Sequence, residues 1–386
     1  MRFCNSIFAS LLKPLDRRCF RAIVERHDGD AYDKSFRSWE HLLALIFAQL
    51  SGLHSLRGVV AGWNANAHHH YHVGAGKLMR STLADANARR PVGVFADCFA
   101  MLSGLADRNT RRDGQAMLRL IDASPIPLGK LCEFATWNGR IRGLKMHAVY
   151  DPLGDRPTRV EVTLASVNDV EIGRKTVLEP GATYVFDKGY CHYGWWRQIH
   201  AAGAWFVTRP KRNVKFRVVE ERALGEVEGE GFRVLSDCAV AWASKGDSVL
   251  AMPLRRVEIE RQDGKPITVL TNQMTRSAVE IALLYKARWQ IELLFRWIKQ
   301  HLELHRFLGN NHNAIQLQII AAMIAYLLLR LAARTHALTL PALRLAELVR
   351  SALFVRKPIA CLHHPPPVNP AKRQAPCPNQ PELCYA

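Results

Sequence analysis

Four polar side chains stand at helical spacing in one short stretch of the chain, at Tyr285, Arg288, Glu292 and Lys299. Their intervals are three, four and seven residues, so at about 100° per residue they fall within a sector of roughly 60° on one helix face. One carboxylate on that face can hold a metal ion while its three neighbours bind phosphate. This combination predicts metal-dependent chemistry on DNA. For any single pair of these residues, a solvated polar face on an amphipathic helix is the alternative.

The spacing Tyr285-x2-Arg288-x3-Glu292-x6-Lys299 resembles the Y-R-E-K signature of the insertion-sequence DDE transposases of the IS-four group. In that family the glutamate is the third catalytic carboxylate. The resemblance implies two upstream aspartates, each at or just beyond the end of a strand in a ribonuclease-H-like sheet. The expected fold class is α/β: a ribonuclease-H-like catalytic core with a β-rich insertion, a helical N-terminal domain and a helical C-terminal region.

Two aspartates fit this expectation. Asp122 directly follows the apolar run 118–121, and the strand breakers Ser124 and Pro125 come after it. Asp187 directly follows the run 182–186, and its sequence Asp-x-Gly-Tyr resembles the family's motif around the second aspartate. An isolated aspartate in such a place is usually a turn or helix-cap residue. The order Asp122, Asp187, Glu292 and the matching local motifs favour a catalytic triad.

Three carboxylates suit hard divalent cations, which prefer oxygen ligands and keep waters and substrate phosphate oxygens in their shells. We therefore expect Asp122, Asp187 and Glu292 to bind Mg²⁺, with Mn²⁺ as a substitute, in a two-metal site for in-line displacement at phosphorus. The resemblance assigns Tyr285, Arg288 and Lys299 to binding the DNA end near the cleavage site. Arg209, at the entrance to the insertion, is a further candidate for a phosphate contact.

The activity implied by the resemblance is cleavage of the ends of an insertion sequence followed by joining of the freed 3′-hydroxyl groups to target DNA. The expected partners are the terminal inverted repeats, the target DNA and a second copy of the chain on DNA. Two alternatives stay open from the sequence. One is a transposase-derived DNA-binding protein that has lost catalysis, and the other is a nuclease of the same fold that cuts without joining.

Charge and cysteine usage agree with a DNA-acting protein in the cytoplasm. Among 386 residues, 53 lysines and arginines against 34 aspartates and glutamates give a formal charge of +19, which indicates a polyanionic partner. On composition alone, a membrane surface or an acidic protein explains that charge equally well. Nine cysteines without a CxxC pair indicate reduced thiols, and the N-terminus has no persuasive export signal. We expect a bacterial cytoplasmic protein that joins the nucleoid when bound to DNA.

The chain divides by pattern into five parts. Residues 1–90 show helical periodicity and are expected to form a DNA-binding domain; 110–208 and 272–312 form the catalytic core; 209–271 form the β-rich insertion. Residues 313–358 are expected to be helical, and the proline-rich stretch 363–386 is expected to be disordered. The apolar run 319–329 has 11 residues, well short of the roughly 20 that span a bilayer, and indicates a buried core helix with no membrane span.

Three groups of residues invite a functional interpretation that we weigh against a plainer one. The cluster from His68 to His72 lacks a cysteine pair or acidic partner at ligand spacing, so we expect a loop or a DNA-facing surface rather than a zinc site. Trp195 and Trp196 are expected to pack in the core, although a tryptophan here could also stack on a base flipped from the DNA end. Basic residues suited to terminal-repeat binding occur throughout the N-terminal part, with solvated surface as the alternative: Arg17, Arg18, Arg21, Arg57, Lys77, Arg80, Arg89 and Arg90.

Overall fold

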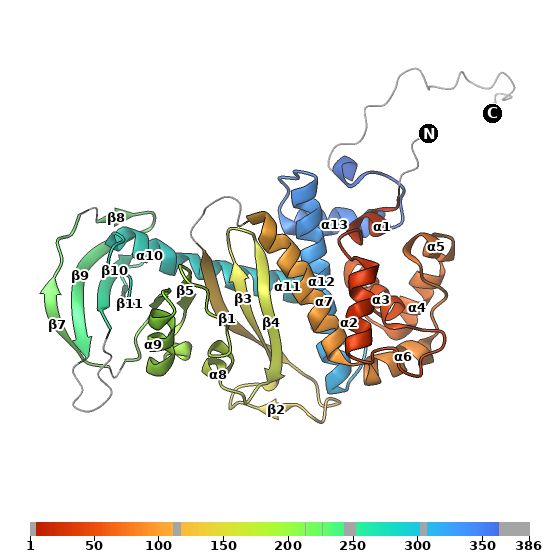
Figure 1. Ribbon diagram of the computed structural model, residues 1–386, viewed down its shortest axis with the longest axis horizontal. Helices are drawn as coiled ribbons and strands as arrows, with labels where there is room; N and C mark the ends of the chain where they lie inside the picture. Colours follow the sequence, from red (N-terminus) through yellow and green to blue (C-terminus); the bar gives the residue numbers. More distant parts are fainter. Residues whose placement is uncertain are drawn as a thin grey trace, which may run out of the picture.

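A computed structural model describes residues 5–110, 117–212, 214–225, 227–242, 252–301 and 307–362. In these ranges, eleven strands form one sheet, ordered β2-β3-β1-β5-β6-β11-β10-β9-β7, with β4 paired to β3 and β8 paired to β9. The sheet runs through the molecule, and the N-terminal helices gather with the helices of residues 312–352 at one of its ends (Figure 1).

Five strands form the centre of the catalytic core: β1 (Leu118–Pro127), β3 (Arg142–Asp151), β4 (Arg156–Leu164), β5 (Thr183–Phe186) and β6 (Trp205–Thr208). Their order is β4-β3-β1-β5-β6, and β3 alone runs antiparallel to its neighbours. The short β2 (Thr136–Trp137) pairs with β3, while α8 (Asp169–Gly173), η3 (Lys188–Tyr190) and α9 (Tyr193–Ala201) lie in the connections to β5 and β6. This arrangement confirms the ribonuclease-H-like core.

The β-rich insertion continues the core sheet rather than forming a separate one. Its strand β11 (Pro266–Thr271) pairs antiparallel with β6, where Leu270 lies opposite Thr208. The remaining strands follow outwards as β10 (Leu254–Arg261), β9 (Phe232–Trp242) and β7 (Phe216–Glu221), with the two-residue β8 (Glu228–Gly229) beside β9. The run Ser248-Val-Leu-Ala-Met252 also predicts a strand, but most of it lies outside the described residues.

Helices from both ends of the chain share one hydrophobic core. The N-terminal helices are α1 (Ile7–Leu11), α2 (Arg17–Arg26), α3 (Ser38–Ser51), α4 (Leu56–Asn64), η1 (Ala67–His69), α5 (His70–Val73), α6 (Arg80–Arg89) and α7 (Val92–Thr110). The C-terminal helices are α10 (Ala278–Ala287), α11 (Trp289–His301), α12 (His312–Thr335), α13 (Ala342–Ala352) and η4 (Ile359–Leu362). Buried side chains of α3, α7, α12 and α13 belong to the same cluster.

The apolar helix α12 belongs to the C-terminal group and packs on α13 and on the N-terminal helices α3, α6 and α7. It is long and apolar enough to cross a membrane, but 83% of its most apolar window is buried inside the protein. The run 319–329 is therefore the buried core helix that the sequence predicts. The expected disordered tail, 363–386, lies outside the described residues.

The structure corrects the interpretation of the histidine cluster. His69 and His70 lie in η1 and α5, not in a loop, and His70 is buried with its ring stacked on Trp63. The His70 Nε2 atom lies 3.0 Å from the carbonyl oxygen of Trp63. Tertiary packing thus uses one histidine of the cluster as a core residue, while His68 and His72 remain exposed.

The two tryptophans of α9 pack in the core, as expected. Trp195 stacks on Phe186 and Trp196 stacks on Phe206, and neither side chain is more than 1% exposed. These rings hold α9 against β5 and β6. In this arrangement neither indole can stack on a DNA base.

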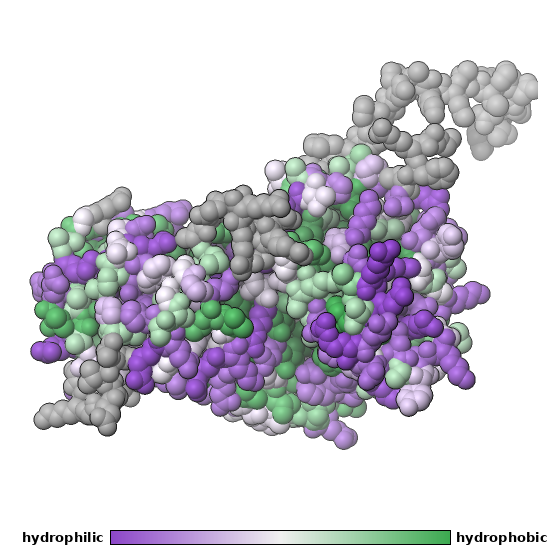
Figure 2. Space-filling view, viewed as in Figure 1, coloured by the Kyte–Doolittle hydropathy of each residue, from purple (hydrophilic) through white to green (hydrophobic). Residues whose placement is uncertain are grey.

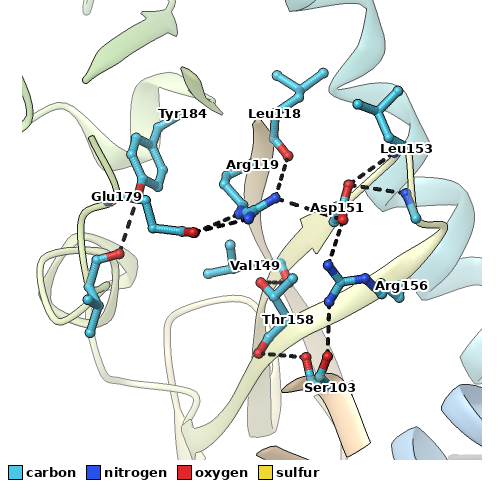
Figure 3. Close-up of polar contacts among 12 residues, drawn as sticks. Ser103, Leu118, Arg119, Val149, Asp151, Leu153, Arg156, Thr158, Glu179 and Tyr184 are labelled. Carbon is cyan, nitrogen blue, oxygen red and sulfur yellow. Dashed lines mark hydrogen bonds and ion pairs between the residues drawn. The ribbon is translucent and has the colours of Figure 1, made fainter. Parts of the chain in front are cut away.

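A buried ion-pair network fixes the beginning of β1, three residues before Asp122 (Figure 3). Arg119 pairs with Glu179 at 2.9 Å and with Asp151 at 3.8 Å. Asp151 also pairs with Arg156 at 2.9 Å, and Arg156 donates to the carbonyl oxygen of Ser103 on α7. The network ties β1, β3, β4 and α7 together below the edge of the sheet that carries Asp122.

Candidate active site

Asp122 and Asp187 occupy matching positions on two adjacent parallel strands. Ile121 of β1 pairs in register with Phe186 of β5, and each aspartate is the next residue along its chain. The carboxyl ends of adjacent parallel strands meet at one edge of a sheet, which brings the two side chains to the same place. Asp187 stands directly beyond the end of β5, as predicted from the sequence.

The prediction that β1 ends before Asp122 is wrong. The strand continues to Pro127, because β3 keeps pairing with it up to the pair Pro127 and Gly143. Ser124 and Pro125 therefore lie within the strand and do not break it. Pro125 is compatible with this position because its side chain is exposed and β5 has already ended on that side.

Glu292 reaches the site from α11, which packs on β1. The preceding helix, α10, begins with the capping box that the sequence Ser277-Ala-Val-Glu280 predicts: Ser277 Oγ accepts from the Glu280 amide, and the Ser277 amide donates to Glu280 Oε2 at 2.7 Å. The signature does not lie on one continuous α-helix, contrary to the sequence expectation. The regular helix is interrupted at Arg288, whose amide donates to the Tyr285 carbonyl three residues back instead of four.

Tyr285 and Arg288 connect the three carboxylates. The guanidinium of Arg288 lies 3.4 Å from Asp122 Oδ2 through Nη1 and 2.7 Å from Glu292 Oε1 through Nη2. The Tyr285 hydroxyl donates to Asp187 Oδ1 at 3.4 Å. The Arg288 guanidinium carbon also lies 5.8 Å from the centre of the Tyr285 ring. All three predicted carboxylates and two of the predicted DNA-binding residues therefore meet in one site.

The burial of Asp122 dominates the electrostatics of this site. Burial raises the pKa of Asp122 to about 6, and the neighbouring carboxylates Glu292 and Asp187 act in the same direction. The hydrogen bond from the Ala123 amide to Asp122 Oδ1, at 2.8 Å, and the charge of Arg288 oppose that rise in pKa. A cation near Asp122 therefore stabilises its ionised form.

The donor chemistry of the site fits a hard divalent cation, since Asp122, Asp187 and Glu292 offer only carboxylate oxygens. The side chains as placed do not form a closed metal cage. Among the described residues, no three Asp, Glu, His or Cys side chains lie close enough together to hold one ion. Instead, the guanidinium of Arg288 forms ion pairs with two of the carboxylates, Asp122 and Glu292.

The other two predicted DNA-binding residues flank the site. Lys299 lies on α11, seven residues after Glu292 and thus roughly 10 Å along the helix. Its side chain is half-buried, burial lowers its pKa, and it forms no ion pair with any residue in the described ranges. Arg209 follows β6, which lies beside β5 at the same sheet edge, and its carbonyl oxygen accepts a hydrogen bond from the Cys191 thiol.

Sequence reasoning missed Trp289, the residue after Arg288. Its indole is 50% exposed, and the Arg296 guanidinium carbon lies 5.7 Å from the ring centre. A large aromatic side chain that stays exposed beside an arginine is a common platform for nucleic-acid bases. The signal in the sequence was its adjacency to Arg288 in the signature.

Comparison with known proteins gives two family matches. Residues 113–328 match the family described as "Transposase DDE domain", and residues 3–76 match a "Domain of unknown function". The first match spans more than half of the chain and contains Asp122, Asp187 and Glu292.

Similar proteins carry names of the same kind. The chain is 60% identical over 304 residues to "Putative transposase y4zB" of Sinorhizobium fredii, covering 78% of this chain and 85% of that protein. It is 28% identical over 254 residues to "Probable transposase for insertion sequence element IS5377" of Geobacillus stearothermophilus, covering 65% of this chain and 66% of that protein. A solved structure of the piggyBac transposase synaptic complex with hairpin DNA aligns with a TM-score of 0.48 and 11% identity, covering 96% of this chain and 85% of that chain.

Proposed function

This chain belongs to the DDE transposase family, and from that premise we propose that it cleaves the ends of its own insertion sequence and joins them to target DNA. Both steps are phosphoryl transfers at one site formed by Asp122, Asp187 and Glu292. The observation that carries the proposal is the meeting of these carboxylates, from β1, β5 and α11, with the signature residues Tyr285 and Arg288.

In this proposal the basic side chains and Tyr285 bind the DNA phosphates, and the carboxylates bind the metal ions. Arg288 can form two parallel hydrogen bonds to a phosphate, and Tyr285 can donate one hydrogen bond to a phosphate oxygen. Lys299 and Arg209 extend the positive surface on either side, where they hold the DNA backbone. The carboxylates stay reserved for metal, so the protein needs no nucleophile of its own.

We propose Mg²⁺ as the cofactor of both steps, with Mn²⁺ as a substitute. When bound, two such ions lower the pKa of the attacking water or 3′-hydroxyl and stabilise the leaving oxygen. Asp122, Asp187 and Glu292 are the residues that would hold them.

DNA binding extends beyond the active site to the N-terminal helices, which we propose contact the terminal repeats. Hydrophilic side chains gather over these helices on the face shown in Figure 2. Arg18 and Arg21 lie on the exposed side of α2, opposite the buried Phe20 and Ile23. Arg90 is an exception among the basic residues considered for this role, because it is buried and paired with Asp30 and Asp33.

Joining two ends in one reaction requires both ends in one complex, so we propose a homodimer on DNA. We further propose that the protein acts in the bacterial cytoplasm, on the nucleoid. Trp289 is positioned to stack on a base near the cleaved phosphate, because it is exposed on the same helix as Glu292.

The test is incubation of the purified protein with its own element ends and a supercoiled plasmid, with Mg²⁺ or with EDTA. The proposal expects Mg²⁺-dependent end cleavage and joined products from wild type. Neither product should form with Asp187→Asn or Glu292→Gln, although both variants should still bind DNA. Asp263→Asn, on the exposed turn between β10 and β11, controls for loss of an aspartate elsewhere.

The products separate the alternatives. Binding without cleavage by wild type would indicate an inactive DNA-binding protein. Cleavage without joining would indicate a nuclease. Cleavage retained by Glu292→Gln would overturn the assignment of the triad.

A further inference from the structure

In the protein without DNA, the positive charge of Arg288 lies among the carboxylates of the candidate active site. Its guanidinium lies between Asp122 and Glu292, at 3.4 Å and 2.7 Å, and the three side chains are 18%, 20% and 31% exposed, in the order Arg288, Asp122, Glu292. Its Nε atom is buried and has no hydrogen-bond partner among the described residues. A guanidinium has five donors, so part of its bonding capacity is unused in this position.

The oxygens that Arg288 contacts are the ones a divalent cation needs. Asp122 Oδ2 and Glu292 Oε1 are both engaged by the guanidinium, and Asp122 Oδ1 already accepts from the Ala123 amide. With Arg288 in place, no three described acidic or imidazole side chains are close enough to hold a metal. Arginine and metal therefore compete for the same ligands.

We infer that Arg288 is an internal counter-ion of the DNA-free site. When DNA binds, Arg288 moves from the carboxylates to a backbone phosphate of the DNA end, and the carboxylates can then bind the metal. This inference rests on the proposed function, because it takes Asp122 and Glu292 as metal ligands and DNA as the source of the phosphate. Arg288 is then a positioning residue in one state and a phosphate ligand in the other.

Charge and geometry support this exchange of partners. A phosphate offers Arg288 the same bidentate geometry as a carboxylate, so the guanidinium loses little when it moves. Its departure leaves Asp122 and Glu292 without their cation, and this raises the affinity of the site for a divalent ion. Linkage requires the converse as well: bound metal must strengthen the binding of the phosphate by the same factor. A DNA-free protein is thereby kept from binding metal tightly and cutting indiscriminately.

The experiment measures Mn²⁺ binding to the DNA-free protein from the electron paramagnetic resonance signal of free Mn²⁺. Arg288→Ala should bind Mn²⁺ about tenfold more tightly than wild type, since it removes both ion pairs that engage Asp122 Oδ2 and Glu292 Oε1. Arg296→Ala is the matched control. It removes an arginine of α11 that lies against Trp289 and, within the described ranges, forms no ion pair with the three carboxylates, so its Mn²⁺ affinity should equal that of wild type.

A second variant protects the test against misfolding. Arg288→Lys keeps the positive charge but lacks the planar fork, so it can hold one carboxylate at a time. Its Mn²⁺ affinity should lie between those of wild type and Arg288→Ala. Circular dichroism spectra that match wild type show that each variant is folded.

The outcomes distinguish failure of this inference from failure of the proposed function. Equal Mn²⁺ affinity in wild type and Arg288→Ala, with binding lost in Glu292→Gln, would overturn the counter-ion role and leave the metal site standing. No Mn²⁺ binding in any of these proteins, together with inactivity toward DNA, would overturn the proposed site itself. Tighter binding in both Arg288→Ala and Arg296→Ala would show a general charge effect and would also overturn the inference.

Discussion

Replacing Asp122 by asparagine should make the metal-free protein more stable at neutral pH while it abolishes catalysis. The side chain of Asp122 is only 20% exposed, and burial raises its pKa from 3.8 to about 6. The pKa of Asp122 in the folded state lies above that of the unfolded chain. The contribution of this group to the free energy of unfolding is therefore fully present below pH 3.8 and is lost as the pH rises through about 6. Above that window the folded protein carries the full cost of the ionised group.

The magnitude follows from the two pKa values. At 1.36 kcal/mol per pH unit, a rise from 3.8 to about 6 corresponds to roughly 3 kcal/mol at pH 7.5, and the same linkage gives about 1 kcal/mol at pH 4.5. The asparagine side chain is nearly isosteric with that of aspartate and carries no charge. Arg288 keeps its shorter contact with Glu292, so the substitution does not leave the guanidinium unpaired.

The assay is urea unfolding of wild type and Asp122→Asn in EDTA between pH 4.5 and 7.5, with Asp263→Asn as the surface control. The gain in unfolding free energy for Asp122→Asn should grow by about 2 kcal/mol across that range. The control should show no comparable change. A loss of stability for Asp122→Asn at pH 7.5, or a difference that does not vary with pH, would refute the account in which the buried, ionised Asp122 destabilises the folded protein.

Three further predictions concern other parts of the structure. Arg288→Ala should weaken binding to the element end and reduce the slope of log affinity against log salt by about one, and an unchanged slope in filter binding would argue against a phosphate contact. Asp151→Ala should lower the unfolding free energy by about 3–5 kcal/mol, because it leaves the buried Arg119 and Arg156 without a shared carboxylate; a loss below about 1 kcal/mol in urea would contradict that role. Ser277→Ala should cost about 1 kcal/mol through loss of the capping box, and a shift in thermal midpoint no larger than that of a surface control would contradict the cap.

The sequence was informative where a local pattern determines local structure. The capping box at Ser277 needs only four consecutive residues, and the apolar run 319–329 identifies a core helix by itself. Asp187 was placed correctly because β5 is short and its end is marked by the glycine that follows. These features depend on neighbours in the chain and on nothing else.

Features that depend on a distant strand or helix could not be read from the sequence. Asp122 lies within β1 because β3, brought back by the connection of residues 128–141, supplies hydrogen-bond partners up to Pro127. The joining of β11 to β6 depends on the register between segments more than 60 residues apart. Helical spacing placed Arg288 beside Glu292, but only the tertiary structure shows that the guanidinium also contacts Asp122.

The two ends of the described chain are joined by backbone hydrogen bonds, and this has a consequence for synthesis. The amides of Ile7 and Phe8 donate to the carbonyl oxygens of Val355 and Leu353, and Ser6 forms a bridge with Arg356. At about 5–20 residues per second, a ribosome takes roughly 20 to 70 seconds to reach these partners after the first helix emerges. During that time the buried face of α1 has no partner from α12 or α13. A nascent chain that stops early is therefore left with exposed apolar helices, so interrupted copies of the gene should yield aggregates rather than stable fragments.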